Sequence, residues 1–146
     1  MAFARTSDIF YPRFACSEEI NIVQQGKNYG WPTIGYGIEY GGAKIGAGLT
    51  QQAGMEQPVY YWDPVVSPSG MTFYNNDAIP EWKNNLFIAA LNLPHIIRLV
   101  IENNKVTGEE RLLVQEQQRF RDIHVGKDGA LYAITDTGKL YRIAKK

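Results

Sequence analysis

Short apolar runs, separated by Gly, Asn and Asp residues, fill the second half of the chain. Runs rich in Val, Ile, Leu, Tyr and Phe and bounded by such turn residues are typical of antiparallel β-strands. The pattern predicts two sets of three strands: Met71–Tyr74, Leu86–Ala90 and Ile96–Ile101, then Arg121–Val125, Leu131–Thr135 and Leu140–Ala144. It also predicts an earlier strand at Ile20–Val23 and a fourth strand of the first set at about Arg111–Gln115.

The two sets of strands are copies of one repeat. Leu86-Phe87-Ile88-Ala89 matches Leu131-Tyr132-Ala133-Ile134 at an offset of 45 residues, and Ile97-Arg98-Leu99 matches Tyr141-Arg142-Ile143 at an offset of 44. Repeats of about 40 to 50 residues built from short strands have the period of propeller blades. The predicted fold class is therefore all-β, a partial β-propeller of antiparallel four-stranded sheets. The second copy has no fourth strand, and in propellers the other end of the chain commonly supplies that edge.

The region from Glu19 to Asp63 is glycine-rich and less regular. After the first strand it is interpreted as a long structured loop with a functional role. Within it, the turn Gly30-Trp31-Pro32 is predicted to combine a special backbone conformation with a buried indole.

Charge and composition narrow the function classes. Fifteen Lys and Arg residues balance fifteen Asp and Glu residues, so there is no excess positive charge to hold nucleic acid or an anionic membrane. The apolar stretches are too short to span a bilayer. The single cysteine, Cys16, excludes an internal disulfide and a cysteine-based metal site.

Three motifs carry a resemblance to a known family: Gly26-Lys27-Asn28-Tyr29-Gly30-Trp31-Pro32, Ser67-Pro68-Ser69-Gly70-Met71, and Arg119-Phe120-Arg121-Asp122-Ile123 followed by Gly129-Ala130-Leu131-Tyr132-Ala133-Ile134-Thr135-Asp136. In this order they resemble the soluble aldose sugar dehydrogenases that use pyrroloquinoline quinone (PQQ), the glucose/sorbosone dehydrogenase family. The similarity runs from about Glu18 to Ile143, so residues 1–17 are expected to be a segment outside the family and residues 18–146 its C-terminal blades. The resemblance implies the last two to three blades of a six-bladed propeller, without the half that carries the catalytic histidine.

Arg119 and Arg121 are the strongest candidates for cofactor binding. They lie two residues apart in a predicted strand, so both side chains leave the same face, and two guanidinium groups there can clamp carboxylates or quinone oxygens. The resemblance implies that they contact the cofactor. The alternative is that they pair with Asp122 or with glutamates on a solvated face.

Two further cofactor-binding candidates, Tyr40 and Asn92, rest on the resemblance. Tyr40 matches a family tyrosine that lines the cofactor site, although it could equally be a packing residue. Asn92 stands near the position of a family lysine. An amide can hydrogen-bond a carbonyl but supplies no positive charge for a reduced quinone.

Glu19 and Tyr29 are the candidate metal ligands. The resemblance implies a calcium ion held by the Glu19 carboxylate and the Tyr29 backbone carbonyl. Calcium takes six to eight oxygen ligands, so two protein ligands predict a weak site, and the alternative for Glu19 is an ordinary surface carboxylate beside Glu18. Neither histidine, His95 nor His124, falls where the family keeps its base, and neither is assigned a role.

Two functions are consistent with these observations. The first is a fragment of a PQQ-dependent dehydrogenase of aldose sugars that contributes the arginine side of the quinone pocket and is inactive alone. The second is a non-catalytic β-module that self-associates through its blade edges. A homo-oligomer is expected in either case, because the end sheets would expose apolar residues such as Ile88, Ile97, Leu131 and Ile134. The segment Ser7–Phe14 could serve as the missing outer strand. The resemblance also implies a periplasmic or extracellular location.

Overall fold

A computed structural model describes residues 3–4, 18–39 and 42–145. The chain divides into two compact units, with the boundary between Val65 and Val66. All the named strands pair antiparallel, and the described residues contain only two short 3-10 helices besides them. No helix in this part of the chain is long and apolar enough to cross a membrane.

The first unit holds one three-stranded sheet in the order β1-β2-β3, made of β1 (Phe3–Ala4), β2 (Glu18–Ile22) and β3 (Tyr60–Trp62). The predicted strand Ile20–Val23 begins two residues after the start of β2, and β3 was not predicted. In the connection between β2 and β3, the described residues form isolated bridges, Ile34 with Leu49 and Ile38 with Lys44, and no further strand. This connection is the structured loop that the glycine-rich sequence indicates.

The Gly30-Trp31-Pro32 turn lies in this connection and differs in part from the prediction. Gly30 has φ +90°, and a Cβ on it would lie 2.6 Å from Cδ1 of Ile34, so the special backbone conformation is confirmed. The buried indole is wrong: Trp31 is 59% exposed. The turn is held by glycine geometry and by backbone hydrogen bonds from Thr33 and Ile34 to the Gly30 carbonyl, at 2.6 and 3.0 Å.

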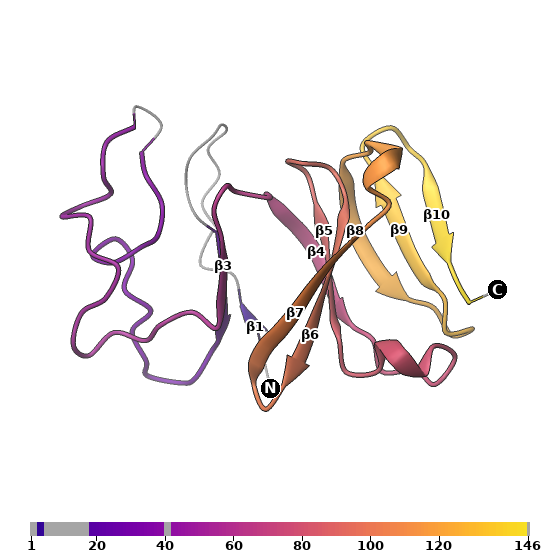
Figure 1. Cartoon of the computed structure of the whole chain (residues 1–146), viewed down its shortest axis with the longest axis horizontal. Coiled ribbons are helices and arrows are strands. Elements are labelled where there is room, and N and C mark those ends of the chain that lie inside the picture. Colours follow the sequence, from indigo (N-terminus) through magenta and orange to yellow (C-terminus); the bar gives the residue numbers. More distant parts are fainter. Residues whose placement is uncertain (1–2, 5–17, 40–41, 146) are drawn as a thin grey trace. The chain divides into compact units, whose positions relative to one another are not determined.

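The second unit contains two sheets (Figure 1). The first is a four-stranded meander, β4-β5-β6-β7, with β4 (Pro68–Phe73), β5 (Leu86–Ala90), β6 (Ile96–Glu102) and β7 (Lys105–Leu112). The second has three strands in the order β10-β9-β8, with β8 (Phe120–Val125), β9 (Leu131–Thr135) and β10 (Leu140–Ile143). The repeat in the sequence thus corresponds to two successive sheets.

The outer strand β7 begins earlier than expected. Asn103 and Asn104 both have positive φ, 49° and 63°, which is the geometry of a tight two-residue hairpin turn. The turn pairs Glu102 directly with Lys105, so the fourth strand covers Lys105–Leu112 instead of Arg111–Gln115. Val114–Glu116 forms a 3-10 helix, η2.

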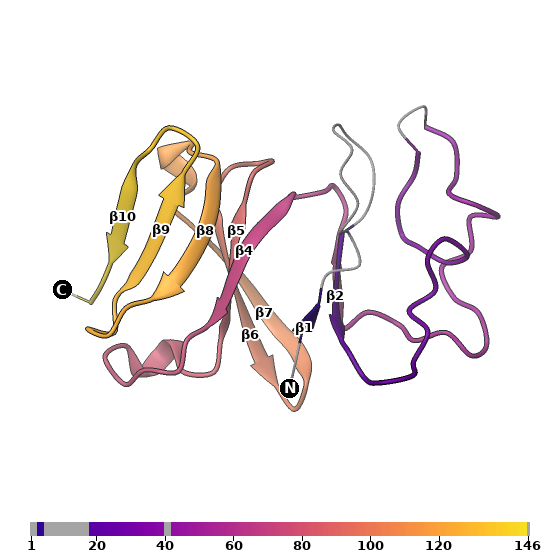
Figure 2. The ribbon, with the colours of Figure 1, turned by 180° about the vertical axis from the view of Figure 1, so that it is seen from behind.

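A core of buried residues fills the space between the two sheets, which face each other in Figures 1 and 2. Its members are Tyr74, Ile79, Phe87, Ala89, Ile96, Phe120, Ile123, Leu131 and Ala133. The sheets are also linked by polar contacts: the Tyr74 hydroxyl donates to the Gly129 carbonyl at 2.6 Å.

The predicted exposure of four apolar residues is mostly wrong. Ile88, Ile97 and Leu131 are fully buried, and only Ile134 is exposed, at 48%. Ile88 and Ile97 pair across β5 and β6 on the face opposite Phe87 and Ala89, whereas Leu131 belongs to the core between the sheets. The segment Ser7–Phe14 lies outside the described residues.

Candidate functional site

The motif Ser67-Pro68-Ser69-Gly70-Met71 and the motif that begins at Arg119 meet where β4 approaches β8. The Ser69 hydroxyl donates to the carbonyl of Phe120 at 2.6 Å. At Gly70, a Cβ would lie 2.7 Å from the Cα of Asp122 and would overlap its carboxylate, so only glycine permits this separation. The backbone around Arg119 and Arg121 is therefore fixed by the Ser69-Gly70 motif of the neighbouring sheet.

A β-bulge re-aims the side chain of Arg121. Phe120 pairs with Thr135 and Asp122 with Ile134, so Arg121 is the extra residue of β8. The bulge switches the alternation: Phe120 and Ile123 are buried in the core, while Arg121 is exposed. Arg121 and Ile123, two residues apart, therefore do not share a face as they would in a regular strand. Bulges of this kind are over-represented next to active sites.

Arg119 and Arg121 converge on one carboxylate, that of Asp136. Nε of Arg119 lies 3.3 Å from Oδ2, and Arg121 binds both carboxylate oxygens, with Nη2 donating to Oδ2 at 3.0 Å. The two arginine side chains are 55% and 50% exposed, and both lie against the carboxylate of Asp136. The alternative of an ion pair is also realised, although the partner is Asp136 and not Asp122 or a glutamate.

Asp136 is the residue that the sequence analysis missed. The hydrogen bond from Arg121 holds the pKa of its carboxyl below the usual value, and the charges of both arginines add to this effect. Asp136 directly follows β9, and its backbone N–H donates to the carbonyl of Arg119 at 3.1 Å. If the register of the β8–β9 hairpin, with Thr135 opposite Phe120, had been known, it would have indicated that Asp136 lies beside Arg119. The sequence does not show that register, because the position of the bulge cannot be recognised from the local pattern.

Asn92 lies in the turn between β5 and β6, at the same end of the β4–β5 pair as Ser69, because Pro68 pairs with Ala90. Its backbone N–H donates to the carbonyl of Val66 at 3.1 Å, and the residue is half-buried. Tyr40 lies outside the described residues.

The candidate calcium ligands both lie beside β2. Glu19 is half-buried, and burial raises the pKa of its carboxyl, while a hydrogen bond from Asn21 acts in the opposite direction. The Asn21 Oδ1 atom is buried with no hydrogen-bond partner. The Tyr29 hydroxyl donates to the carbonyl of Ile22 at 2.8 Å, which holds this residue against the end of β2.

These groups do not amount to a complete cation site. Within the described ranges, no group of three or more His, Cys, Asp or Glu residues could hold a metal ion. One carboxylate with a raised pKa and one unpaired amide oxygen are a small part of the oxygen set that calcium needs.

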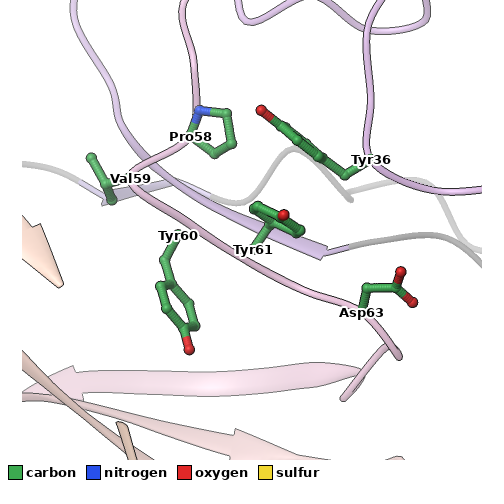
Figure 3. A pocket seen from close by; sticks show the side chains of 6 residues that line it. All are labelled: Tyr36, Pro58, Val59, Tyr60, Tyr61 and Asp63. Atoms are coloured by element: carbon green, nitrogen blue, oxygen red, sulfur yellow. The ribbon is translucent and has the colours of Figure 1, made fainter. Parts of the chain in front are cut away.

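A pocket of about 570 Å³ opens beside β3 in the first unit (Figure 3). Its rim carries Asp63 and the rings of Tyr36 and Tyr61, which stack with centroids 4.1 Å apart. Tyr60 projects from the other side of the strand, as strand alternation requires (Figure 3). Tyrosine hydroxyls and a carboxylate suit a polar ligand, but none of the predicted site residues lines this pocket.

Neither histidine offers a general base. His95 is buried, its Nδ1 contacts the carbonyl of Leu93, and its Nε2 has no partner. Burial lowers the pKa of His95 to about 4, with a further lowering by the charge of Arg111 and an opposing effect of Glu109. His124 is exposed.

Comparisons with known proteins agree with the motifs. The family model "Glucose / Sorbosone dehydrogenase" matches residues 15–142. Aldose sugar dehydrogenase YliI from Escherichia coli is 45% identical over 132 residues, which are 88% of this chain and 36% of that protein. The crystal structure of the soluble aldose sugar dehydrogenase from E. coli in its apo-form is 44% identical, with a TM-score of 0.81 over 90% of this chain and 39% of that one.

A more distant structure shares the fold. The PQQ-bound form of an aldose sugar dehydrogenase from Streptomyces coelicolor is 22% identical, with a TM-score of 0.60 over 97% of this chain and 38% of that one. The chain thus spans little more than a third of the length of these relatives, and its all-β, antiparallel architecture corresponds to part of their β-propeller. By its motifs, its fold and the family match over most of its length, the chain belongs to the glucose/sorbosone dehydrogenase family.

Proposed function

We propose that this chain contributes the arginine side of a quinone-binding pocket in a PQQ-dependent dehydrogenase of aldose sugars. The proposal rests mainly on one observation: Arg119 and Arg121 both contact the carboxylate of Asp136 at the bulge of β8, and both arginine side chains are about half exposed. PQQ is planar and polyanionic, and paired guanidinium groups suit its carboxylates. When bound, the quinone supplies the hydride acceptor. Arg119 and Arg121 would hold its acidic edge, and Asn92 and Tyr40 are proposed as further contacts.

This chain by itself is proposed to bind the cofactor without turning over sugar. His95 is buried, with a pKa of about 4, and His124 is exposed. Among the described residues, no side-chain hydrogen bond orients either ring as a proton acceptor towards the arginines. The catalytic base would come from the portion of the family fold that this chain does not span.

The test separates binding from turnover. The chain is titrated with PQQ while quinone absorbance is followed, and sugar-dependent dye reduction is measured in the same samples. Saturable binding that is lost in an Arg119→Gln/Arg121→Gln variant, without dye reduction, is the expected result. Dye reduction by the chain alone would contradict the proposed inactivity. Equal binding by the double variant would contradict the arginine site.

Calcium is proposed only as a weak ligand at Glu19, with a dissociation constant of about 10⁻⁴ to 10⁻³ M, since few protein oxygens are available. Calcium titration followed by the thermal midpoint tests this, with Glu19→Gln as the variant and Glu56→Gln as the control. Glu56 is also a carboxylate of the first unit, but it pairs with Lys27 at 2.9 Å. A calcium-dependent rise of the midpoint that survives in Glu19→Gln would contradict the assignment.

A second candidate function, a self-associating β-module, is favoured by the outer face of the β8–β10 sheet. Ile134 and Leu140 pair across β9 and β10 and are 48% and 65% exposed, so they form an adjacent apolar pair. β10 pairs only with β9 among the described strands, which leaves one edge for another strand.

Light scattering at micromolar concentration tests this second function. The expected result is a dimer or larger species that an Ile134→Lys/Leu140→Lys variant reduces to a monomer. Leu93→Lys is the control, since Leu93 is exposed to a similar degree, 46%, but lies outside this sheet. A monomeric wild-type chain would exclude self-association. The proposed periplasmic or extracellular location remains a prediction from the family.

A further inference from the structure

The Asp136 carboxylate contacts the guanidinium groups of Arg119 and Arg121 at the same time. It binds Nε and Nη2 of Arg121 and lies 3.3 Å from Nε of Arg119. Within the described part of the chain, Nη1 of Arg121 and both terminal nitrogens of Arg119 have no ion pair or hydrogen bond. The same nitrogens are the donors that a guanidinium group presents to a carboxylate ligand in a fork.

The turn that carries Asp136 is braced from both sides. The Thr137 hydroxyl donates to the side-chain carbonyl of Gln118 at 2.7 Å, and Oγ1 of Thr135 lies 3.0 Å from Oγ1 of Thr137. The backbone N–H of Lys139 donates to the Thr135 hydroxyl at 3.2 Å. These bonds, with the one from the Asp136 N–H to Arg119, join the β9–β10 turn to the residues just before β8. The carboxylate therefore sits on a fixed support.

The charges of the three groups explain why a carboxylate is needed there. Two guanidinium groups brought together repel each other, and a single anion between them lowers that repulsion and leaves one net positive charge. Long arginine side chains that are half exposed would otherwise sample many rotamers, and ordering them on binding costs about 0.5–1.5 kcal/mol for each side chain. A carboxylate that already orders them removes part of this cost.

We propose that Asp136 is the positioning residue of the arginine pair: it holds Arg119 and Arg121 side by side so that their terminal nitrogens bind the carboxylates of one rigid, planar polycarboxylate. The inference rests on the proposed function for the identity of the ligand. Asp136 itself does not contact the ligand in this arrangement. Its effect is on the geometry of the donors and on selection of a multiply charged ligand over a small anion.

The main test compares PQQ with inorganic sulfate as probes of the full chain. Asp136→Asn is expected to weaken PQQ binding by about tenfold or more, by analogy with metal sites, where loss of a partner that orients a ligating residue costs about 10- to 100-fold in affinity. Sulfate binding is expected to stay equal or to tighten, because the pair gains a net positive charge. A merely structural role of Asp136 would weaken both ligands together.

Asp128→Asn is the matched control. Asp128, in the turn between β8 and β9, is also a carboxylate bound by an arginine, with Nη2 of Arg142 at 2.8 Å, and its removal changes the net charge equally. PQQ affinity within about twofold of wild type is expected for this variant, since an exposed pair elsewhere has a small effect. Equal weakening in Asp128→Asn and Asp136→Asn, or tighter PQQ binding by Asp136→Asn, would overturn the proposal.

The arginine Nε–H signals in ¹H–¹⁵N NMR spectra provide a readout that needs no ligand. In the wild type the Arg121 Nε–H is expected to exchange slowly with water, and in Asp136→Asn to exchange fast. If the wild type fails to bind PQQ, the proposed function fails, and these signals still decide the positioning of the pair. Unchanged exchange would overturn it.

A second variant covers the case in which Asp136→Asn does not fold. Thr137→Val keeps the carboxylate and removes the brace to Gln118. Several-fold weaker PQQ binding with an unchanged sulfate affinity is expected. PQQ affinity equal to the wild type, in a folded Thr137→Val chain with fast Arg121 Nε–H exchange, would overturn the role of the fixed turn.

Discussion

The hydroxyl of Ser69 in β4 donates a hydrogen bond of 2.6 Å to the backbone carbonyl of Phe120 in β8, and it lies 3.1 Å from the carbonyl oxygen of Ala89. The small side chain of Ser69 thus connects β4 of one sheet to β8 of the next. The carbonyl that it binds lies between Arg119 and Arg121, so this contact belongs both to the packing of the sheets and to the candidate cofactor site.

Replacing Ser69 with Ala should lower the free energy of unfolding by about 1–3 kcal/mol, because the Phe120 carbonyl loses a partner in a partly buried position. Chemical denaturation measures the loss. Thr72→Val is the control: this hydroxyl of the same strand has only a 3.5 Å contact with the adjacent Phe73 carbonyl. A Ser69→Ala chain as stable as Thr72→Val would show that the bond contributes nothing.

Replacing Gly70 with Ala should be at least as harmful, with a loss of about 1–3 kcal/mol or more. The new Cβ would lie 2.7 Å from the Cα of Asp122, and backbone moves less readily than a flexible side chain. Thermal unfolding should show a clear fall of the midpoint, and the Arg121 region should shift in NMR spectra. Gly35→Ala, where no atom lies within 4 Å, is the matched control. Equal midpoints for the two variants would contradict the close approach.

The Gly-Trp-Pro turn should depend on its glycine and not on its indole. Gly30→Ala combines a φ of +90° with overlap on Ile34, whereas Trp31→Ala removes a side chain that is already 59% exposed. We expect a loss of about 1–3 kcal/mol for the first and within about 0.5 kcal/mol for the second. Gly26→Ala, with φ +76° and no neighbour within 4 Å, separates backbone strain from overlap. A large loss in Trp31→Ala would restore the buried-indole prediction.

His95 should make the fold less stable in mild acid. Its pKa is about 4 in the folded chain and about 6.5 in an unfolded one, so below pH 6.5 the unfolded state binds a proton that the folded state does not. The contribution of the neutral ring is complete above pH 6.5, falls as the pH drops towards 4, and levels off below that.

His95→Gln should therefore flatten the pH dependence of the unfolding free energy between pH 6.5 and 4, measured by urea denaturation at each pH. His124→Gln, the same change at an exposed position, is the control. If both variants kept the wild-type slope, the buried histidine would have no part in acid sensitivity.

Much of the fold could be predicted because its information is local. Leu86–Ala90 and Leu131–Thr135 are short runs rich in apolar residues and bounded by turn residues, and both strands are found with the predicted bounds. The offset of about 45 residues between them likewise requires no knowledge of the packing. Strand ends were less accurate, as at β7, where two asparagines with positive φ allow the chain to return at once.

The candidate site was predicted only in part, because some of its contacts are not local in the sequence. Two arginines spaced by one residue predicted a shared side; in the structure both contact the Asp136 carboxylate, and Arg121 does so from a bulge. Their partner Asp136 depends on the register of β8 against β9, and an inserted residue in β8 changes that register without leaving a mark in the local pattern.

The sequence by itself determined the strand-and-turn plan, the repeat and the family, because each of these rests on residue types at short separations or on motifs read in order. Only the tertiary structure decided that Arg121 occupies a bulge, that Asp136 joins it to Arg119, that Trp31 is exposed and that Ile88 and Ile97 are buried. Those features depend on which strands pair and which faces are covered. Contacts between residues far apart in the chain set them, and no single stretch of sequence contains both partners.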